Sequence, residues 1–144
     1  MELNFLSGHK VRMVKAAQSS AGTDVDSSVV DMQGFLDATF FVTIATANAA
    51  NFLKLQQGDE SDGSDMADLE GTKVVAAADG DVVCAEVFRP LKRYVRAVVD
   101  RGGADTATGD MYCVQSQARV VPVDNNEAGE IVSEIHATPA EGTA

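Results

Sequence analysis

Apolar and polar residues alternate most regularly between Leu36 and Thr46. Apolar side chains occupy every second position of this segment, with Phe40 and Ile44 among them, and polar side chains fill most of the positions between. Successive side chains of a strand point to opposite faces of its sheet, so the segment is predicted to be a strand with one buried face. Phe41 falls on the polar side. Because burying such a ring is worth roughly 1.5–3 kcal/mol, we expect another part of the chain to cover it.

Shorter runs rich in valine are separated by turns rich in glycine, aspartate and asparagine. Roughly seven or eight short strands at a spacing of about 8–12 residues, with no long helical pattern, predict an antiparallel β-sandwich or barrel. The polar segment QSSAGTD at 18–24 is predicted to be a loop. Besides 36–46, the predicted strands are at 11–17, near Val29 and Val30, and at 52–57, 74–78, 82–88, 93–100 and 111–121, with a short strand or helical turn at 66–69.

The two ends of the chain differ in composition from this β-rich middle. Met1 to Lys10 is short and mixed, and after Arg119 the chain contains five acidic residues and no basic one. This last stretch also contains proline and glycine, a composition that favours an extended arm over core strands. We therefore predict an N-terminal arm at 1–10, a β-sandwich domain at 11–121 and a C-terminal arm at 122–144.

The chain has 144 residues, of which 45% are apolar, enough to fill the core of one domain. Acidic residues outnumber basic ones by 22 to 11, which gives a net charge of −11. Non-specific binding to nucleic acid depends on lysine and arginine at the surface, so this balance disfavours nucleic acid as a partner. No apolar run approaches the roughly 18–20 residues of a membrane span, and we expect neither a signal peptide nor a membrane partner.

Few residues of this chain are suited to catalysis or metal binding. A zinc site needs about four ligands, and the candidates Cys84, Cys113, His9 and His136 are scattered over the whole length. We interpret the two cysteines, which lie in valine-rich segments, as buried thiols, although their spacing leaves a disulfide open. No motif of a serine hydrolase, metalloprotease or nucleotide-binding enzyme occurs. We therefore expect no catalytic, cofactor-binding or metal-ligating residues, and no enzymatic activity.

The loop from Asp59 to Asp65 gathers carboxylates around Gly63, an arrangement that could suit a cation such as calcium. The EF-hand pattern, however, needs aspartate at its first position and glutamate at its twelfth. Placing Gly63 at the sixth position puts Gly58 at the first and Leu69 at the twelfth, so the pattern fails. We interpret the segment as a solvated, charged loop, and the binding of a cation there stays open.

Five of the eleven basic residues lie between Arg89 and Arg101, with Tyr94 among them as a ring on which a base could stack. Alternation divides these residues between the two faces of a strand, so they do not form a single basic stripe. Arginine pairs well with carboxylates, and acidic residues lie nearby in the sequence. We therefore interpret the segment as a site of salt bridges or of a protein interface rather than of nucleic-acid binding.

Three motifs follow one another along the chain. They are F-x-V-x-I at Phe40 to Ile44, a turn of the form Q-x-S/G-D-x-S-D-G at Gln57 to Gly63, and K-R-Y-V-R-A-V-V at Lys92 to Val99. In this order they resemble the small structural proteins encoded near the major capsid gene of tailed bacteriophages, and the resemblance covers residues 11–120. It implies a virion component, similar to capsid cement or decoration proteins, with a jelly-roll or related sandwich and no catalytic residues.

The resemblance implies the major capsid protein as the partner, bound across joints between its subunits on the capsid exterior after assembly in the host cytoplasm. We expect self-association as a dimer or trimer, with contacts made first by the two arms and second by residues 89–96. Binding the assembled lattice better than free subunits would stabilise the shell by mass action. Two alternatives stay open: a head–tail or tail structural protein, and a small β-sandwich module that binds carbohydrate or another surface ligand. The second needs exposed aromatic residues, for which the candidates are Phe41, Phe52, Phe88, Tyr94 and Tyr112.

Overall fold

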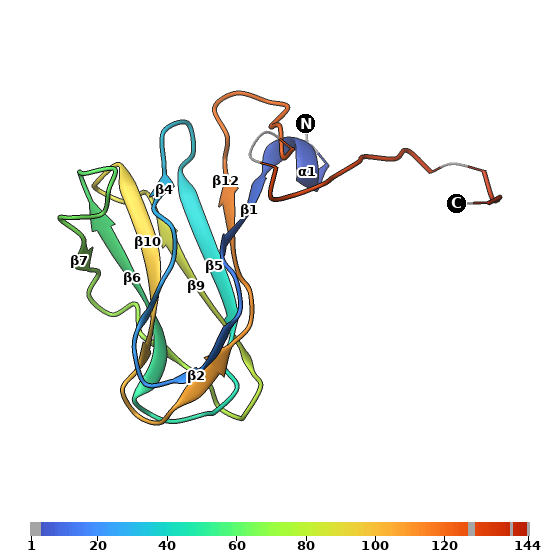
Figure 1. The fold of residues 1–144 in the computed structure, drawn as a ribbon. Helices are drawn as coiled ribbons and strands as arrows, with labels where there is room; N and C mark the ends of the chain where they lie inside the picture. The colour runs from blue at the N-terminus through green and yellow to red at the C-terminus, as the bar shows by residue number, and fades with distance from the viewer. Residues whose placement is uncertain (1–3, 127–128, 139, 144) are drawn as a thin grey trace.

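Two antiparallel sheets pack face to face in the computed structural model, which describes residues 4–126, 129–138 and 140–143 (Figure 1). The first sheet has the order β1 (Lys10–Lys15), β12 (Met111–Ser116), β5 (Asp37–Thr43) and β9 (Val82–Phe88). In the second sheet, β10 (Tyr94–Arg101) pairs on one side with β3 (Val25–Asp26) and β4 (Val30–Asp31). On its other side β10 pairs with β6 (Asn51–Gly58), which pairs in turn with β7 (Ala67–Asp68) and β8 (Val74–Val75). The other described elements are the helix α1 (Phe5–Gly8) and the pair formed by β2 (Gln18–Ala21) and β11 (Thr106–Thr108).

The chain crosses from one sheet to the other at most of its connections. It passes from β1 to β3 and β4, back to β5, across to β6, β7 and β8, back to β9, across to β10 and finally to β12. A sandwich with this order is a jelly roll, in which Greek-key connections bring strands that are distant in sequence side by side. The predicted antiparallel, jelly-roll-like β-sandwich is therefore confirmed.

The core lies between the two sheets and is filled by alternate residues of their strands. Phe40 of β5, Leu53 of β6 and Val95 of β10 are completely buried there. The alternation predicted for 36–46 is confirmed, because the even-numbered residues 38–44 are buried and most residues between them are partly exposed. The pattern of apolar positions thus predicts correctly which side chains of β5 face the core and which face outward.

The outer face of the first sheet carries Phe41, opposite Tyr112 of β12 and Cys84 of β9. The Phe41 ring is half-buried at this position. Cys113 is buried as predicted, and both cysteines are free thiols. The prediction of a buried thiol is wrong for Cys84, which is exposed because it occupies an outward-facing position of β9.

Several segments differ from the strands and loops predicted for them. The predicted loop 18–24 contains β2, whose polar side chains are largely exposed and whose partner β11 comes from a distant part of the chain. The strand predicted at 111–121 ends at Ser116, because Gln117 adopts a left-handed φ of 54°. The single strand expected near Val29 and Val30 is two short strands, β3 and β4, which both pair with β10. The strands predicted at 36–46 and 74–78 are shorter in the structure, where they are β5 and β8.

Parts of the two predicted arms contact each other beside β1. The main-chain N–H of Val123 donates to the oxygen of Ser7 in α1 at 2.9 Å. The side chain of Asn125 is buried, and its Oδ1 accepts the N–H of Val11 at 2.6 Å. Its Nδ2 donates to two main-chain oxygens of the segment before β1, at 2.9 and 3.0 Å. The chain just after 121 is therefore attached to α1 and β1.

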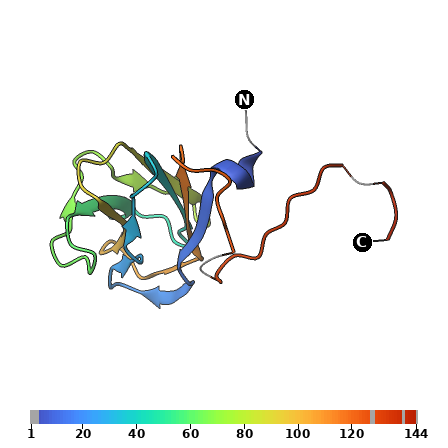
Figure 2. The same cartoon turned by 90° about the horizontal axis from the view of Figure 1, so that it is seen from above.

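Farther along, the chain runs away from the sandwich as an extended C-terminal tail, defined here as residues 129–138 and 140–143 (Figures 1 and 2). Residues 1–3, 127–128, 139 and 144 of the predicted arms lie outside the described residues. The domain boundaries at 10 and 122 stay a prediction. Within the described part of the chain, no helix is long and apolar enough to cross a membrane.

Replacing Asn125 with alanine is expected to lower the free energy of unfolding by about 1–3 kcal/mol, because the Val11 N–H and two main-chain oxygens lose a buried partner. Chemical denaturation measures this change. Asn126→Ala is the matched control, since among the described residues that side chain hydrogen-bonds only to the main chain of Ser133, at an exposed site. Equal losses in the two variants would contradict the anchoring role of Asn125.

Candidate docking surfaces

The acidic loop 59–65 is held together by its own hydrogen bonds. The Asp65 carboxylate accepts the main-chain N–H groups of Asp59 at 2.8 Å and Glu60 at 3.0 Å, and these bonds lower the pKa of Asp65. Lys92 pairs with Asp59 at 3.0 Å and with Asp65 at 3.7 Å. Across the residues that the structure describes, no group of three or more His, Cys, Asp or Glu side chains is arranged to hold a metal ion. The aspartate carboxylates of this loop therefore accept hydrogen bonds from main-chain N–H groups or pair with Lys92.

Basic residues of β10 and of the segment just before it form the salt bridges that the composition of this region predicts. Arg93 pairs with Asp31 at 2.8 Å, and Arg96 pairs with Asp26 at 3.3 Å. Arg101 differs, because its side chain is buried and donates to main-chain oxygens. The interpretation of this segment as a site of salt bridges is therefore confirmed, whereas its use as a protein interface stays a prediction.

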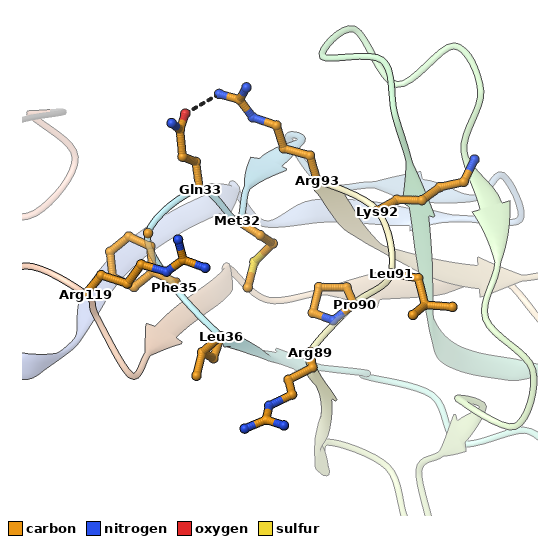
Figure 3. A pocket seen from close by; sticks show the side chains of 11 residues that line it. Met32, Gln33, Phe35, Leu36, Arg89, Pro90, Leu91, Lys92, Arg93 and Arg119 are labelled. Atoms are coloured by element: carbon orange, nitrogen blue, oxygen red, sulfur yellow. Dashed lines mark hydrogen bonds between the residues drawn. The ribbon is translucent and has the colours of Figure 1, made fainter.

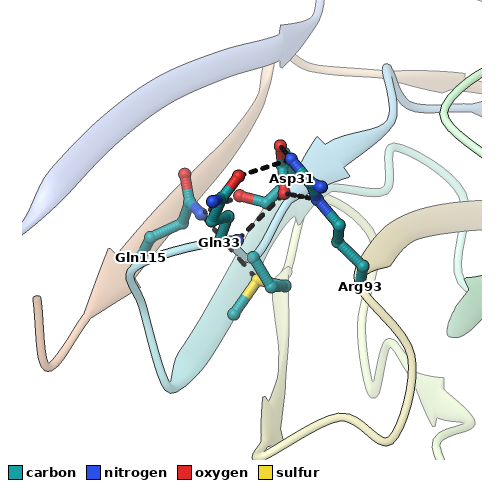
Figure 4. A network of polar contacts seen from close by, with 5 residues as sticks. Asp31, Gln33, Arg93 and Gln115 are labelled. Atoms are coloured by element: carbon teal, nitrogen blue, oxygen red, sulfur yellow. Dashed lines mark hydrogen bonds and ion pairs between the residues drawn. The ribbon is translucent and has the colours of Figure 1, made fainter. Parts of the chain in front are cut away.

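A polar network fixes the end of β4 against β12 (Figure 4). Nε and Nη2 of Arg93 donate to the two carboxylate oxygens of Asp31, at 2.9 and 2.8 Å. The main-chain N–H of Gln33 donates to the same carboxylate, and Arg93 also donates to the side-chain oxygen of Gln33. Gln115, which is buried, donates to the main-chain oxygen of Asp31 at 2.9 Å. The network joins the two sheets and positions the loop after β4.

Acid is expected to destabilise the domain through Asp31. The hydrogen bonds from Arg93 hold the pKa of Asp31 below its usual value in the folded state. Such a carboxylate contributes stability above its unfolded pKa of about 3.9, and this contribution is lost as the pH falls through the lower folded pKa. We expect Asp31→Asn to be less stable than the wild type at neutral pH and to lose less stability between about pH 4 and pH 2. Urea midpoints across this range measure the effect, and parallel curves for the two proteins would contradict it.

The network borders a pocket of about 570 Å³ at one end of the sandwich (Figure 3). This volume lies within the range of roughly 300–1,000 Å³ that is usual for ligand sites. Three separate segments line the pocket: the loop 32–36 between β4 and β5, the connection 89–93 between β9 and β10, and Arg119 after β12. Its basic side chains are Arg89, Lys92, Arg93 and Arg119.

The backbone holds two of these arginines in fixed places. The main-chain N–H of Arg89 donates to the oxygen of Leu36 at 2.7 Å, and that of Arg119 donates to the oxygen of Gly34 at 2.8 Å. Arg89 and Gln117 have left-handed φ angles of 51° and 54°. A side chain other than glycine costs roughly 1–2 kcal/mol in this region, and such residues concentrate at functional sites. Arg89 directly follows β9, and Gln117 directly follows β12. Both residues therefore lie at the end of the sandwich where the pocket opens.

A second surface lies on the outer side of the first sheet, where several apolar side chains surround the exposed Glu86 of β9. We call it the apolar face, and its residues are Phe41, Val82, Cys84, Phe88 and Tyr112. Val82 is 64% exposed and Phe88 is 55% exposed, although both belong to a regular strand. The outer side of the second sheet is different, because ion pairs lie across it. The two outer sides of the sandwich thus offer different chemistry to a partner.

The aromatic residues that a sugar-binding platform needs are divided between these two sides. Phe52 lies on the outer side of the second sheet, where the Lys73 ammonium is 4.2 Å from its ring centre. Tyr94 lies there too, beside the guanidinium of Arg93. The other three candidates belong to the apolar face. The five rings therefore do not form one continuous stacking surface.

The histidines and cysteines stay scattered in the described part of the chain and join no group that could hold a metal ion. The His9 ring stacks on Phe5, and His136 lies 3.1 Å from Glu134 in the C-terminal tail. Burial raises the pKa of the Cys113 thiol to about 12, so this thiol is protonated at neutral pH.

Residue spacing did not identify the pocket, because its walls come from three loops that only the jelly-roll topology brings together. The segment 89–96 was a candidate interface, and the structure places its first part in the pocket wall. Arg119 and the loop 32–36 were missed. Nothing local in the sequence marks them, since arginine after a strand and Gly34 in a turn are both ordinary features.

No protein-family model and no curated protein sequence matches the chain. The solved structure described as PBSX exported protein XepA matches 98% of this chain with a TM-score of 0.54 and 16% sequence identity. The match covers 44% of that protein, so this chain spans less than half of its length. A second match, to CBM22-1–GH10 modules of Clostridium thermocellum xylanase 10B complexed with xylohexaose, has a TM-score of 0.40 and 11% identity, and covers 85% of this chain and 30% of that one. The first likeness shows a common fold, and the second is too weak to carry an argument.

Proposed function

We propose that this chain is a structural protein of a tailed-bacteriophage particle and acts as a capsid cement protein bound to the major capsid protein. The observation that carries the proposal is the apolar face, where Val82 and Phe88 are mostly exposed on one strand. These two side chains lie at opposite ends of β9 with the exposed Glu86 between them, and exposed apolar side chains with polar neighbours commonly mark a site that another protein covers. The motif order of residues 40–99 supports a phage structural role, and the jelly-roll sandwich supplies a rigid support for such a surface.

The proposed mechanism is mechanical. The apolar face would lie across a joint between two capsid subunits, and the N-terminal arm would add contacts to the same neighbours. Each buried apolar side chain contributes roughly 1.5–3 kcal/mol at most, and repetition around a symmetric shell adds avidity. Because the chain would bind the assembled lattice better than free subunits, it would stabilise the shell by mass action. A net charge of −11 suits the capsid exterior, away from packaged DNA.

Gel densitometry of purified particles tests the proposal and its alternatives. A cement protein is expected in mature particles at a copy number comparable with that of the major capsid protein. A copy number far below this would favour a head–tail or tail protein. Absence from particles contradicts every structural role, and binding to a glycan array without binding to shells would support the carbohydrate alternative.

Replacing Val82 and Phe88 together with serine is expected to weaken binding to empty shells by at least about tenfold, because both side chains would lose apolar contact with the capsid. Co-sedimentation of full-length protein with shells measures the binding. Val75→Ser is the control, since Val75 is also exposed on a strand but belongs to the second sheet. Both variants should unfold at the wild-type denaturant concentration. Wild-type shell binding by the double variant would show that the apolar face is not the docking surface.

A further inference from the structure

The pocket in Figure 3 contains two basic side chains without an acidic partner. Its other two basic side chains are paired with aspartates, whereas no carboxylate among the described residues pairs with Arg89 or Arg119. In the view of Figure 3, Leu36 lies between the two guanidinium groups. Guanidinium groups bind carboxylates through two parallel hydrogen bonds. In a chain with a net charge of −11, this local excess of positive charge favours an acidic ligand.

The same pocket has an apolar wall. Leu91 at its rim is 93% exposed, and Phe35 and Leu36 are half-buried in its lining. A small inorganic anion would pair with the arginines but would leave Leu91 in water. A peptide that carries acidic and apolar side chains together would satisfy both parts of the pocket.

The C-terminal tail of this chain has that composition. Val132 is 94% exposed and Ile135 is 54% exposed, and Glu134 lies between them. After Arg119 the sequence contains five acidic residues and no lysine or arginine. The tail leads away from the sandwich, which makes the exposed side chains of Val132 and Ile135 available to a partner (Figures 1 and 2).

The start of the tail is held beside its own N-terminal segment. The Asn126 side chain and the main chain of Ser133 exchange two hydrogen bonds, at 2.8 and 3.3 Å, and Arg12 pairs with Glu130 at 3.5 Å. From there the chain leads away from its own sandwich (Figures 1 and 2). We propose that the segment 132–136 of one copy binds in the pocket of a second copy.

In this contact Glu134 lies against Arg89 and Arg119, and the neighbouring Val132 packs on Leu91. Each copy has one tail and one pocket. Two copies can therefore exchange tails reciprocally, or a series of copies can close into a ring. The inference goes beyond the proposed function and does not depend on it, because it concerns contacts between copies and not contacts with a capsid.

Disulfide trapping between two full-length chains tests the contact directly. One chain carries Leu91→Cys and the other carries Val132→Cys, both with Cys84→Ser, while Cys113 stays buried. Mixed and mildly oxidised, they are expected to form disulfide-linked heterodimers, since a disulfide requires Cα atoms within about 7 Å. A chain with Val75→Cys in place of Leu91→Cys is the control and should not cross-link above background. The absence of heterodimers, or an intrachain disulfide in a Leu91→Cys/Val132→Cys chain, would overturn the proposal.

Charge reversal in the full-length protein provides a second test. The pair Arg89→Glu and Arg119→Glu, and separately Glu134→Arg, should each weaken self-association by at least about tenfold in analytical ultracentrifugation. Mixing the two variants should restore association between them, because the reversed charges match again. Lys15→Glu, on β1 away from the pocket, is the control and should associate like the wild type.

Arg89 needs a further variant because its backbone is left-handed. Arg89→Gly with Arg119→Ala removes both charges and relaxes the backbone, and it should also weaken self-association. Wild-type association in both pocket variants, or a monomeric wild type, would overturn tail exchange. A chain that binds shells but does not cross-link would refute tail exchange alone. A chain that cross-links but does not bind shells would refute the cement function alone.

Discussion

Replacing Phe40 with alanine is expected to lower the free energy of unfolding by about 3–5 kcal/mol. The ring is completely buried on β5, and its neighbours on the two adjoining strands are Cys113 and Ala85. Because these neighbours are small, they cannot fill the space that the ring leaves, and a cavity remains between the sheets. Small domains have a total stability of about 5–15 kcal/mol, so the variant should be close to unfolding.

Phe41→Ala is the matched control for this prediction. The residue is adjacent in sequence and of the same type, but it faces outward and is half-buried. Its removal should cost about 1–2 kcal/mol, because the ring lies on the outer side of the sheet, where its loss leaves no enclosed cavity. Urea unfolding of both variants measures the difference, and similar losses at the two positions would contradict the assignment of inner and outer faces.

Arg101→Met is expected to lower the free energy of unfolding by about 3–4 kcal/mol. The guanidinium is buried, and it donates to the main-chain oxygens of Ser19 at 2.9 Å, Thr106 at 2.8 Å and Thr23. These oxygens belong to the β2–β11 end of the sandwich, where methionine can fill the volume but cannot donate a hydrogen bond. Each buried oxygen that loses its donor costs about 1–3 kcal/mol.

Two variants control for the Arg101 prediction. Arg101→Lys retains the charge and some of the donors, so an intermediate loss of stability is expected. Arg96→Met removes an arginine that is partly exposed and bonded to Gln56 and Asp26, and it should cost about 0.5–1 kcal/mol. Guanidinium chloride unfolding measures all three proteins. If Arg101→Met and Arg96→Met lose similar amounts, the main-chain oxygens do not depend on Arg101.

Alternation in the sequence was sufficient to identify the strands that border the core. A strand with one buried face repeats its apolar residues every second position, as Phe40, Val42 and Ile44 do, and only one register buries them all. The segment 18–21 shows the limit of this reasoning. Its residues QSSA are polar because little of β2 is buried, and its pairing with β11 depends on a contact that is distant in sequence.

The candidate site was predicted only in part. Local composition indicated that the bases near Arg93 would find acidic partners, and most of them do. The composition could not show that Arg89 and Arg119 would remain without one, because that outcome depends on how three loops meet at the end of the sandwich. The sequence also did not indicate the left-handed φ angle of Arg89, because positions with such a φ angle usually contain glycine.

The position of β12 has a consequence for synthesis on the ribosome. It is the last described strand to be translated, yet it lies in the middle of the first sheet, between β1 and β5. A nascent chain that ends before residue 111 therefore presents two open strand edges, on β1 and on β5, for which no partner has yet been made. The first sheet can be completed only after β12 has been synthesised. Sandwiches of this topology then fold in roughly milliseconds to seconds. During that interval the open edges of β1 and β5 expose the unfinished sheet to pairing with a neighbouring polypeptide.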